Sequence, residues 1–188
     1  MTAQRLGIRV ADAETEGILH VPEVRAAATA VVLPDAEPDV ALAGALAREG
    51  VAALALAFRE PRSIASALAD AQAALRVVRA HGGVPERMAL VGSGFGAAVA
   101  AIAAGRDSRV RAAVLVGPPA EIADGWRPMV ELSRTRARVL LAQGDAARYA
   151  GVLSQARVSH LIRDAVDAAA AAAFIEEAFS PRMRGQED

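Results

Sequence analysis

Residues 88–98 read MALVGSGFGAA, an apolar run that reaches three closely spaced glycines and continues into alanines. The pattern predicts a strand, a tight turn and a helix, and Gly92, Gly94 and Gly96 indicate that the backbone of the turn passes close to other atoms. Short apolar runs alternate with helical patterns along the rest of the chain. This alternation predicts the α/β class, with a doubly wound, mostly parallel sheet that carries helices on both faces.

The remaining elements follow from the same patterns. Strands are expected at 17–21, 28–33, 51–58, 87–91, 110–116, 138–142 and 157–162, and helices at 38–50, 63–83, 95–105 and 166–179. Apolar runs without polar alternation are typical of strands covered on both faces, so 51–57, 87–91 and 110–116 are expected near the centre of about seven strands. A single domain is expected over 1–188, with its core at about 17–179 and a frayed tail at 181–188. Residues 117–137, which hold the only tryptophan, are expected to form a loop or short cap.

Composition excludes several classes of function. The formal net charge is −1, from 21 basic and 22 acidic residues, so neither nucleic acid nor a membrane surface is an expected partner. The chain has no cysteine, which excludes disulfides, thiolate metal sites and a cysteine nucleophile. Its most apolar stretch, 96–105, is shorter than the roughly 20 residues of a membrane span, and residues 1–17 do not have the pattern of a secretory signal. The expected location is the cytoplasm.

Two kinds of site place glycines at the carboxyl end of a parallel strand. One is the dinucleotide fingerprint, whose spacing Gly92, Gly94 and Ala97 match. Several strands precede this turn, however, and the next strand ends in LVGPP, without the carboxylate that binds a ribose. The other is the nucleophile elbow, which requires small residues two positions before and after the nucleophile. Gly92 and Gly96 match those positions, and Gly94 then stands where the nucleophile belongs.

The whole chain resembles a known family at this point. The elbow sequence ALVGSGFGAAVAAIAA at 89–104, RVLLAQGDA at 138–146 and a closing strand and helix resemble the α/β-hydrolase fold. The likeness is greatest to the small dienelactone-hydrolase-like branch, over about residues 17–179. It implies a minimal fold with little or no cap, and an ester hydrolase with a serine nucleophile, an acid and a histidine.

The chain departs from that family at each catalytic position. Glycine replaces the serine at position 94, Asp145 stands one residue before the family's acid, and no histidine occurs at 163–167. After the strand at 28–33, the family's His-Gly motif and glycine-rich oxyanion loop are replaced by DAEPD. The acidic side chains of Asp35 and Glu37 would oppose a developing oxyanion. A conventional serine-hydrolase mechanism is therefore not expected.

Three functions remain open. The first is a pseudoenzyme that has lost catalysis and binds a small molecule or a protein partner at the former active-site mouth. The second is an active ester hydrolase with Ser93, Asp145 and His160 as candidate catalytic residues. Ser93 would shift the elbow by one residue, and His160 within a strand is typical of a packed histidine. The third is a nucleotide-binding protein that uses the 92–97 turn.

The expected elbow and pocket are confined to two segments and one proline. They comprise Gly92, Ser93, Gly94, Phe95, Gly96, Pro34, Asp35, Ala36 and Pro118. A positive φ is expected at Gly94, because an elbow apex lies in a region that glycine occupies at little cost. No metal and no cofactor are expected, since Asp35, Glu37 and Asp145 lack a neighbouring histidine and the spacing of a metal site.

Overall fold

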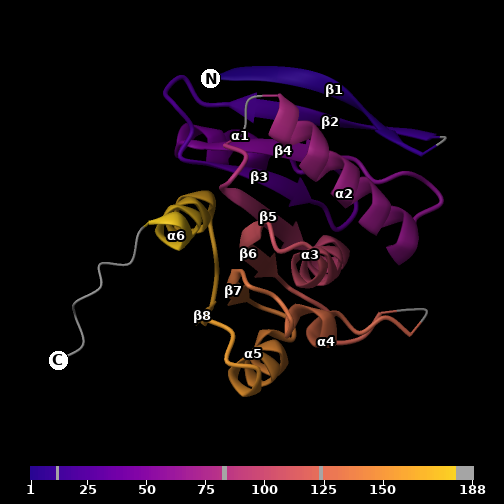
Figure 1. Ribbon diagram of the computed structural model, residues 1–188, viewed down its shortest axis with the longest axis vertical. Coiled ribbons are helices and arrows are strands. Elements are labelled where there is room, and N and C mark those ends of the chain that lie inside the picture. The colour runs from indigo at the N-terminus through magenta and orange to yellow at the C-terminus, as the bar shows by residue number, and fades with distance from the viewer. Residues whose placement is uncertain (12, 82–83, 123–124, 181–188) are drawn as a thin grey trace.

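A computed structural model describes residues 1–11, 13–81, 84–122 and 125–180, and the expected frayed tail lies outside these residues. Eight strands of the described chain form one sheet in the order β1-β2-β4-β3-β5-β6-β7-β8, which runs from top to bottom in Figure 1. The strands are β1 (Thr2–Val10), β2 (Ala13–Val21), β3 (Ala28–Leu33), β4 (Val51–Leu56), β5 (Met88–Ser93), β6 (Val110–Val116), β7 (Arg138–Ala142) and β8 (His160–Arg163). β1 and β2 pair antiparallel, β2 pairs antiparallel with β4, and all other pairs are parallel.

Helices cover both faces of this sheet. α1 (Val40–Arg48) and α6 (Ala168–Phe179) pack on one face, and α2 (Ile64–Ala80), α3 (Gly94–Arg106), α4 (Pro128–Leu132) and α5 (Ala146–Gln155) contribute to the core on the other. Neighbouring residues of β5 alternate between the two cores, with Leu90 in one and Val91 in the other, and both are buried. This arrangement explains why the central strands are apolar at every position, and it confirms the expected fold class.

Several elements begin where the sequence indicates. The carboxylate of Asp39 accepts the backbone N–H of Leu42 at 2.8 Å, which caps α1. Ser63 and Ser66 form a reciprocal capping box at the start of α2. β5 lies between β3 and β6, as expected for a strand of the sheet centre. Among the described residues, no helix is long and apolar enough to cross a bilayer.

The structure differs from the sequence expectation mainly at the N-terminus. The sheet begins at Thr2, not at about residue 17, and has eight strands in place of about seven. β1 lies at the edge of the sheet and buries only every second residue (Leu6, Ile8 and Val10), so it has no continuous apolar run. Helix α5 was also not expected. Within 117–137 the described residues include the short helix α4, which packs against α3.

Candidate functional site

The elbow between β5 and α3 has the tight geometry that its glycines predict. Strand β5 ends at Ser93 and helix α3 begins at Gly94, whose φ of +48° confirms the expected left-handed conformation. A Cβ on Gly92 would overlap the backbone of Gly96, and a Cβ on Gly96 would overlap the carbonyl group of Leu33. Both flanking positions therefore require glycine, and position 94 is the apex of the turn.

The carboxylate of Asp35 lies on this apex. Asp35 comes from the segment that follows β3, and its Oδ1 accepts the backbone N–H of Phe95 at 2.7 Å. The same carboxylate occupies the space that a Cβ on Gly94 would need. In an elbow hydrolase, the backbone N–H of the residue after the nucleophile helps to bind the oxyanion. Here that donor binds a carboxylate of the chain itself.

Two further side chains hold this arrangement. Nη1 of Arg62 donates to the carbonyl oxygen of Asp35 and, at 3.5 Å, to that of Ala36. The Arg62 guanidinium also lies 5.1 Å from the centre of the Phe95 ring, a favourable cation–π contact. Phe58 packs edge-on against Phe95, with ring centres 5.7 Å apart. Arg62 and Phe58 were not predicted as site residues, because neither belongs to a motif.

The three candidate catalytic residues do not lie at the same end of the parallel strands. Ser93 and Asp145 are at the carboxyl ends of their strands. The strand register places Ser93 level with Arg163 of β8. His160 is the first residue of β8 and pairs with Val139, near the beginning of β7. Three strand spacings and three residues of β8 separate Ser93 from His160, which corresponds to about 17 Å. The structure therefore does not bring these candidates together.

Asp145 stabilises a neighbouring loop. Its Oδ2 accepts the backbone N–H of Ala120 at 2.8 Å, and its Oδ1 lies 3.8 Å from the guanidinium of Arg148. Asp145 occupies the N-cap position of α5, but its side chain makes no capping hydrogen bond there. The hydroxyl of Tyr149 donates to the carbonyl oxygen of Pro119, in the same loop. Burial, together with the nearby charge of Asp145, raises the pKa of Tyr149 above its usual value.

No histidine base is placed at the elbow. The sequence has three histidines, and the structure describes all of them. His20 is buried on β2, and His81 follows α2, where its Nδ1 lies 3.0 Å from the carbonyl oxygen of Val77. His160 binds the carbonyl oxygen of Val158 through Nδ1 at 2.9 Å. A general base must approach its nucleophile within hydrogen-bond distance, so Ser93 has no histidine partner.

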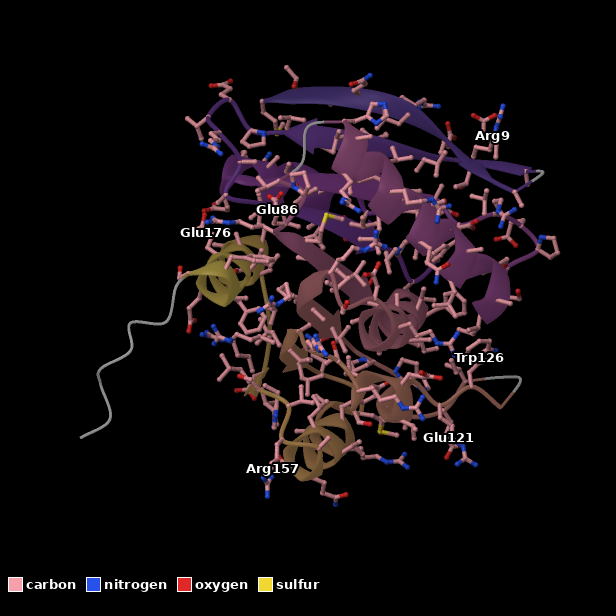
Figure 2. All side chains as sticks on the ribbon, in the orientation of Figure 1. Arg9, Glu86, Glu121, Trp126, Arg157 and Glu176 are labelled. Atoms are coloured by element: carbon pink, nitrogen blue, oxygen red, sulfur yellow. The ribbon has the colours of Figure 1, made fainter. Side chains whose placement is uncertain are left out.

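Two cavities lie outside the elbow, and neither is lined by 34–36, by 92–96 or by Pro118. One, of about 690 Å³, lies between the β1–β2 hairpin and residues 57–60, next to Phe58. The other, of about 440 Å³, is lined by the segment after β6 and by α4 and α5. Ile122, Trp126 and Met129 supply its apolar wall, and Figure 2 shows Trp126 and Glu121 on the same side of the molecule. The described residues contain no group of three acidic or histidine side chains that could hold a metal ion.

No protein-family model and no curated protein matches the chain. Solved structures resemble it over most of its length. A putative dienelactone hydrolase from Klebsiella pneumoniae has a TM-score of 0.72 at 16% identity, and the match covers 87% of this chain and 85% of that one. A dienelactone hydrolase from Anabaena variabilis has a TM-score of 0.70 at 15% identity, covering 95% and 96%. An esterase from Pyrobaculum calidifontis has a TM-score of 0.74 at 15% identity, covering 94% and 85%.

Identities this low carry information about architecture and not about chemistry. The strand order, the antiparallel β1–β2 pair and the turn from β5 into α3 are observed independently in the chain itself. Together with these likenesses, they show that the chain has the α/β-hydrolase fold, in a form similar to dienelactone hydrolases and esterases.

Proposed function

We propose that this chain is a non-hydrolytic member of the α/β-hydrolase fold, which binds a small molecule or a protein partner where hydrolases carry out their reaction. The observation that carries the proposal is the contact between Asp35 Oδ1 and the N–H of Phe95, at 2.7 Å, above an apex that is glycine. Acyl transfer needs a nucleophile, a base and free oxyanion donors together. At this elbow the nucleophile position is Gly94, which has no side chain, and the N–H of Phe95 already donates to Asp35.

Electrostatics supports the same proposal. A developing oxyanion at this elbow would lie beside the carboxylate of Asp35, and like charge raises the energy of the transition state. The same repulsion disfavours a nucleotide phosphate at the 92–97 turn, the third function that the sequence left open. A carboxylate at the N-terminus of α3 is itself favourable, because the helix dipole attracts negative charge there.

The cavity beside Trp126 offers a second place for a ligand, outside the elbow. Trp126 lies against Arg106, the last residue of α3, whose guanidinium is 4.9 Å from the ring centre. The cavity's volume of about 440 Å³ falls within the range of about 300–1,000 Å³ that is usual for small-ligand pockets. Ile122, Trp126 and Met129 offer apolar contact, while Glu121 and Arg148 supply charged groups. A small, mainly apolar ligand with one polar end fits this lining best.

An active ester hydrolase is the competing function. It is favoured by the similar solved structures, which include dienelactone hydrolases and esterases. It would have to use Ser93, the only hydroxyl residue of the elbow sequence 92–97. It would also need a base other than the three histidines described above.

The two functions predict different results with short p-nitrophenyl esters. We expect Ser93→Ala to hydrolyse these esters at the same rate as the parent. Ser108→Ala, at an exposed serine between α3 and β6, is the control and should give that same rate. We also expect no labelling by a fluorophosphonate probe. Labelling at Ser93, with activity lost in Ser93→Ala alone, would establish the hydrolase. Titration with the same esters should change the emission of Trp126, the only tryptophan, and an unchanged emission would reject ligand binding at its cavity.

A further inference from the structure

A third cavity lies at the amino ends of the parallel strands, where β6 and β7 begin and where α5 and α6 end. Its volume is about 560 Å³. The described lining includes four arginines (Arg111, Arg136, Arg138 and Arg157) and four hydroxyl residues, and it includes no carboxylate. In Figure 2, Arg157 is labelled near the bottom of the view and Trp126 at its right. The recess is separate from the elbow, because Arg138 pairs with Ala112 near the start of β6, whereas Ser93 pairs with Val116 at its end. Its lining is rich in guanidinium groups.

The unsatisfied donors are on the guanidinium groups, since the hydroxyls of Ser133, Thr135 and Ser180 already donate to backbone carbonyl oxygens. Arg138 donates from Nη2 to Glu177 at 2.9 Å, but its Nε is buried and has no hydrogen-bond partner. Arg111, Arg136 and Arg157 are exposed, and none of them forms an ion pair within the described part of the chain. A buried donor without an acceptor is unfavourable, and a bound anion would satisfy it.

Arginines near helix ends also have an ordinary role, which is to neutralise the carbonyl groups of the last turn. The C-termini of α5 and α6 border the cavity, and each carries about half a negative charge. Those two ends and Glu177 together balance about half of the charge of four guanidinium groups. A surplus of about two positive charges remains in the recess.

The backbone at Arg157 adds an independent observation. Its φ is +56°, a left-handed conformation in which glycine is the usual residue after a helix. The N–H of Val158 donates to the carbonyl oxygen of Leu153 at 2.9 Å, so the chain closes α5 in the manner of a Schellman motif. The position thus holds a guanidinium where a residue without a side chain would be less strained, and that guanidinium lines the recess.

We propose that this recess, lined by Arg111, Arg136, Arg138 and Arg157, binds a small molecule that carries phosphate groups. Guanidinium groups match phosphate oxygens in pairs of charge-assisted hydrogen bonds. The net charge of the whole chain is −1, so it has no general attraction for polyanions, and the positive charge is local. The site is independent of the proposed function at the elbow, and either can be wrong without the other.

Pyrophosphate is the probe that tests this proposal, by titration calorimetry at low salt. We expect one saturable site on the parent protein, with binding at least tenfold weaker in Arg136→Gln. Arg76→Gln, at an exposed arginine of α2, should bind as the parent does. Arg157→Gly is the most informative variant, because it removes the guanidinium and also the backbone strain. It should weaken binding at least tenfold while the protein remains as stable as the parent in denaturant melts.

Several outcomes would overturn the proposal. They are the absence of binding by the parent, an equal loss in Arg76→Gln, or unchanged binding in both Arg136→Gln and Arg157→Gly. Citrate binding as tightly as pyrophosphate would show that the recess does not select phosphate. A short RNA that binds more tightly than pyrophosphate would assign the arginines to nucleic acid instead.

Discussion

Replacing Gly94 with serine restores the residue type that a hydrolase elbow carries, and it perturbs two features of the apex at once. Gly94 has a φ of +48°, so any side chain there is strained. A Cβ at this position also overlaps the carboxylate of Asp35 and would displace it from the N–H of Phe95. The two effects can be separated with Asp35→Ala, which removes the carboxylate and leaves the strain.

The structure gives a magnitude for each effect. The left-handed conformation costs a residue other than glycine about 1–2 kcal/mol. The hydrogen bond from Phe95 to Asp35 is charge-assisted, but Asp35 is exposed, so its loss costs about 1 kcal/mol. Gly94→Ser should therefore lower the unfolding free energy by about 2–3 kcal/mol in the parent. In the Asp35→Ala background only the strain remains, and the cost falls to about 1–2 kcal/mol.

The assay is equilibrium urea unfolding of the parent, both single variants and the double variant. Gly117→Ser is a matched control, because Gly117 has a φ of +61° and a Cβ there would meet no described atom within 4 Å. It should show the strain alone, and its effect should not change when Asp35→Ala is added. The reasoning fails if Gly94→Ser has the same effect in both backgrounds, or if it is no more destabilising than Gly117→Ser.

Two other predictions concern buried ionisable groups. Arg59→Met should lower the unfolding free energy by about 3 kcal/mol, because it leaves the fully buried carboxylate of Asp70 without its charged partner. The control Arg76→Met should change the unfolding free energy by less than about 0.5 kcal/mol. Equal effects of the two variants in urea melts would contradict this prediction. Burial, with Arg48 nearby, lowers the pKa of His20 from its usual 6.5, so the unfolded chain takes up the proton first as the pH falls. Stability should decrease from about pH 6.5 down to the lowered pKa, and His20→Gln should lose this part of the pH dependence in melts at several pH values.

Local signals in the sequence predicted much of the fold, because they act on neighbouring residues. The apolar residues of β5 must be covered on both faces, so the sequence alone predicts that this strand lies inside the sheet. The capping side chains of Asp39 and Ser63 marked the first turns of α1 and α2. Strand β1 gave a weaker signal, because its polar side faces solvent, and its pairing with β2 is a tertiary contact.

The candidate site was harder to predict, because catalytic side chains must lie at the same end of the parallel strands. Asp145 and His160 both belong to the last third of the chain, but one follows a parallel strand and the other begins one. A strand of four or five residues separates these two positions along the strand direction, so the two side chains lie at opposite ends of the strands. Asp35 was expected to oppose an oxyanion by its charge alone. Its position on the elbow depends on Arg62, which is 27 residues away in sequence.

The contact at Asp35 also explains how α3 is capped. The first backbone N–H groups of a helix have no partners within it, and Ser93 at the N-cap position makes no side-chain hydrogen bond. An elbow hydrolase leaves such a donor open for the substrate oxyanion. In this chain the N–H of Phe95 donates to Asp35, from the segment that follows β3, and the Asp35 carboxylate acts there as an N-cap carboxylate does. One contact thus stabilises the start of a buried helix and occupies the donor that acyl transfer would need, so freeing that donor for catalysis would weaken α3.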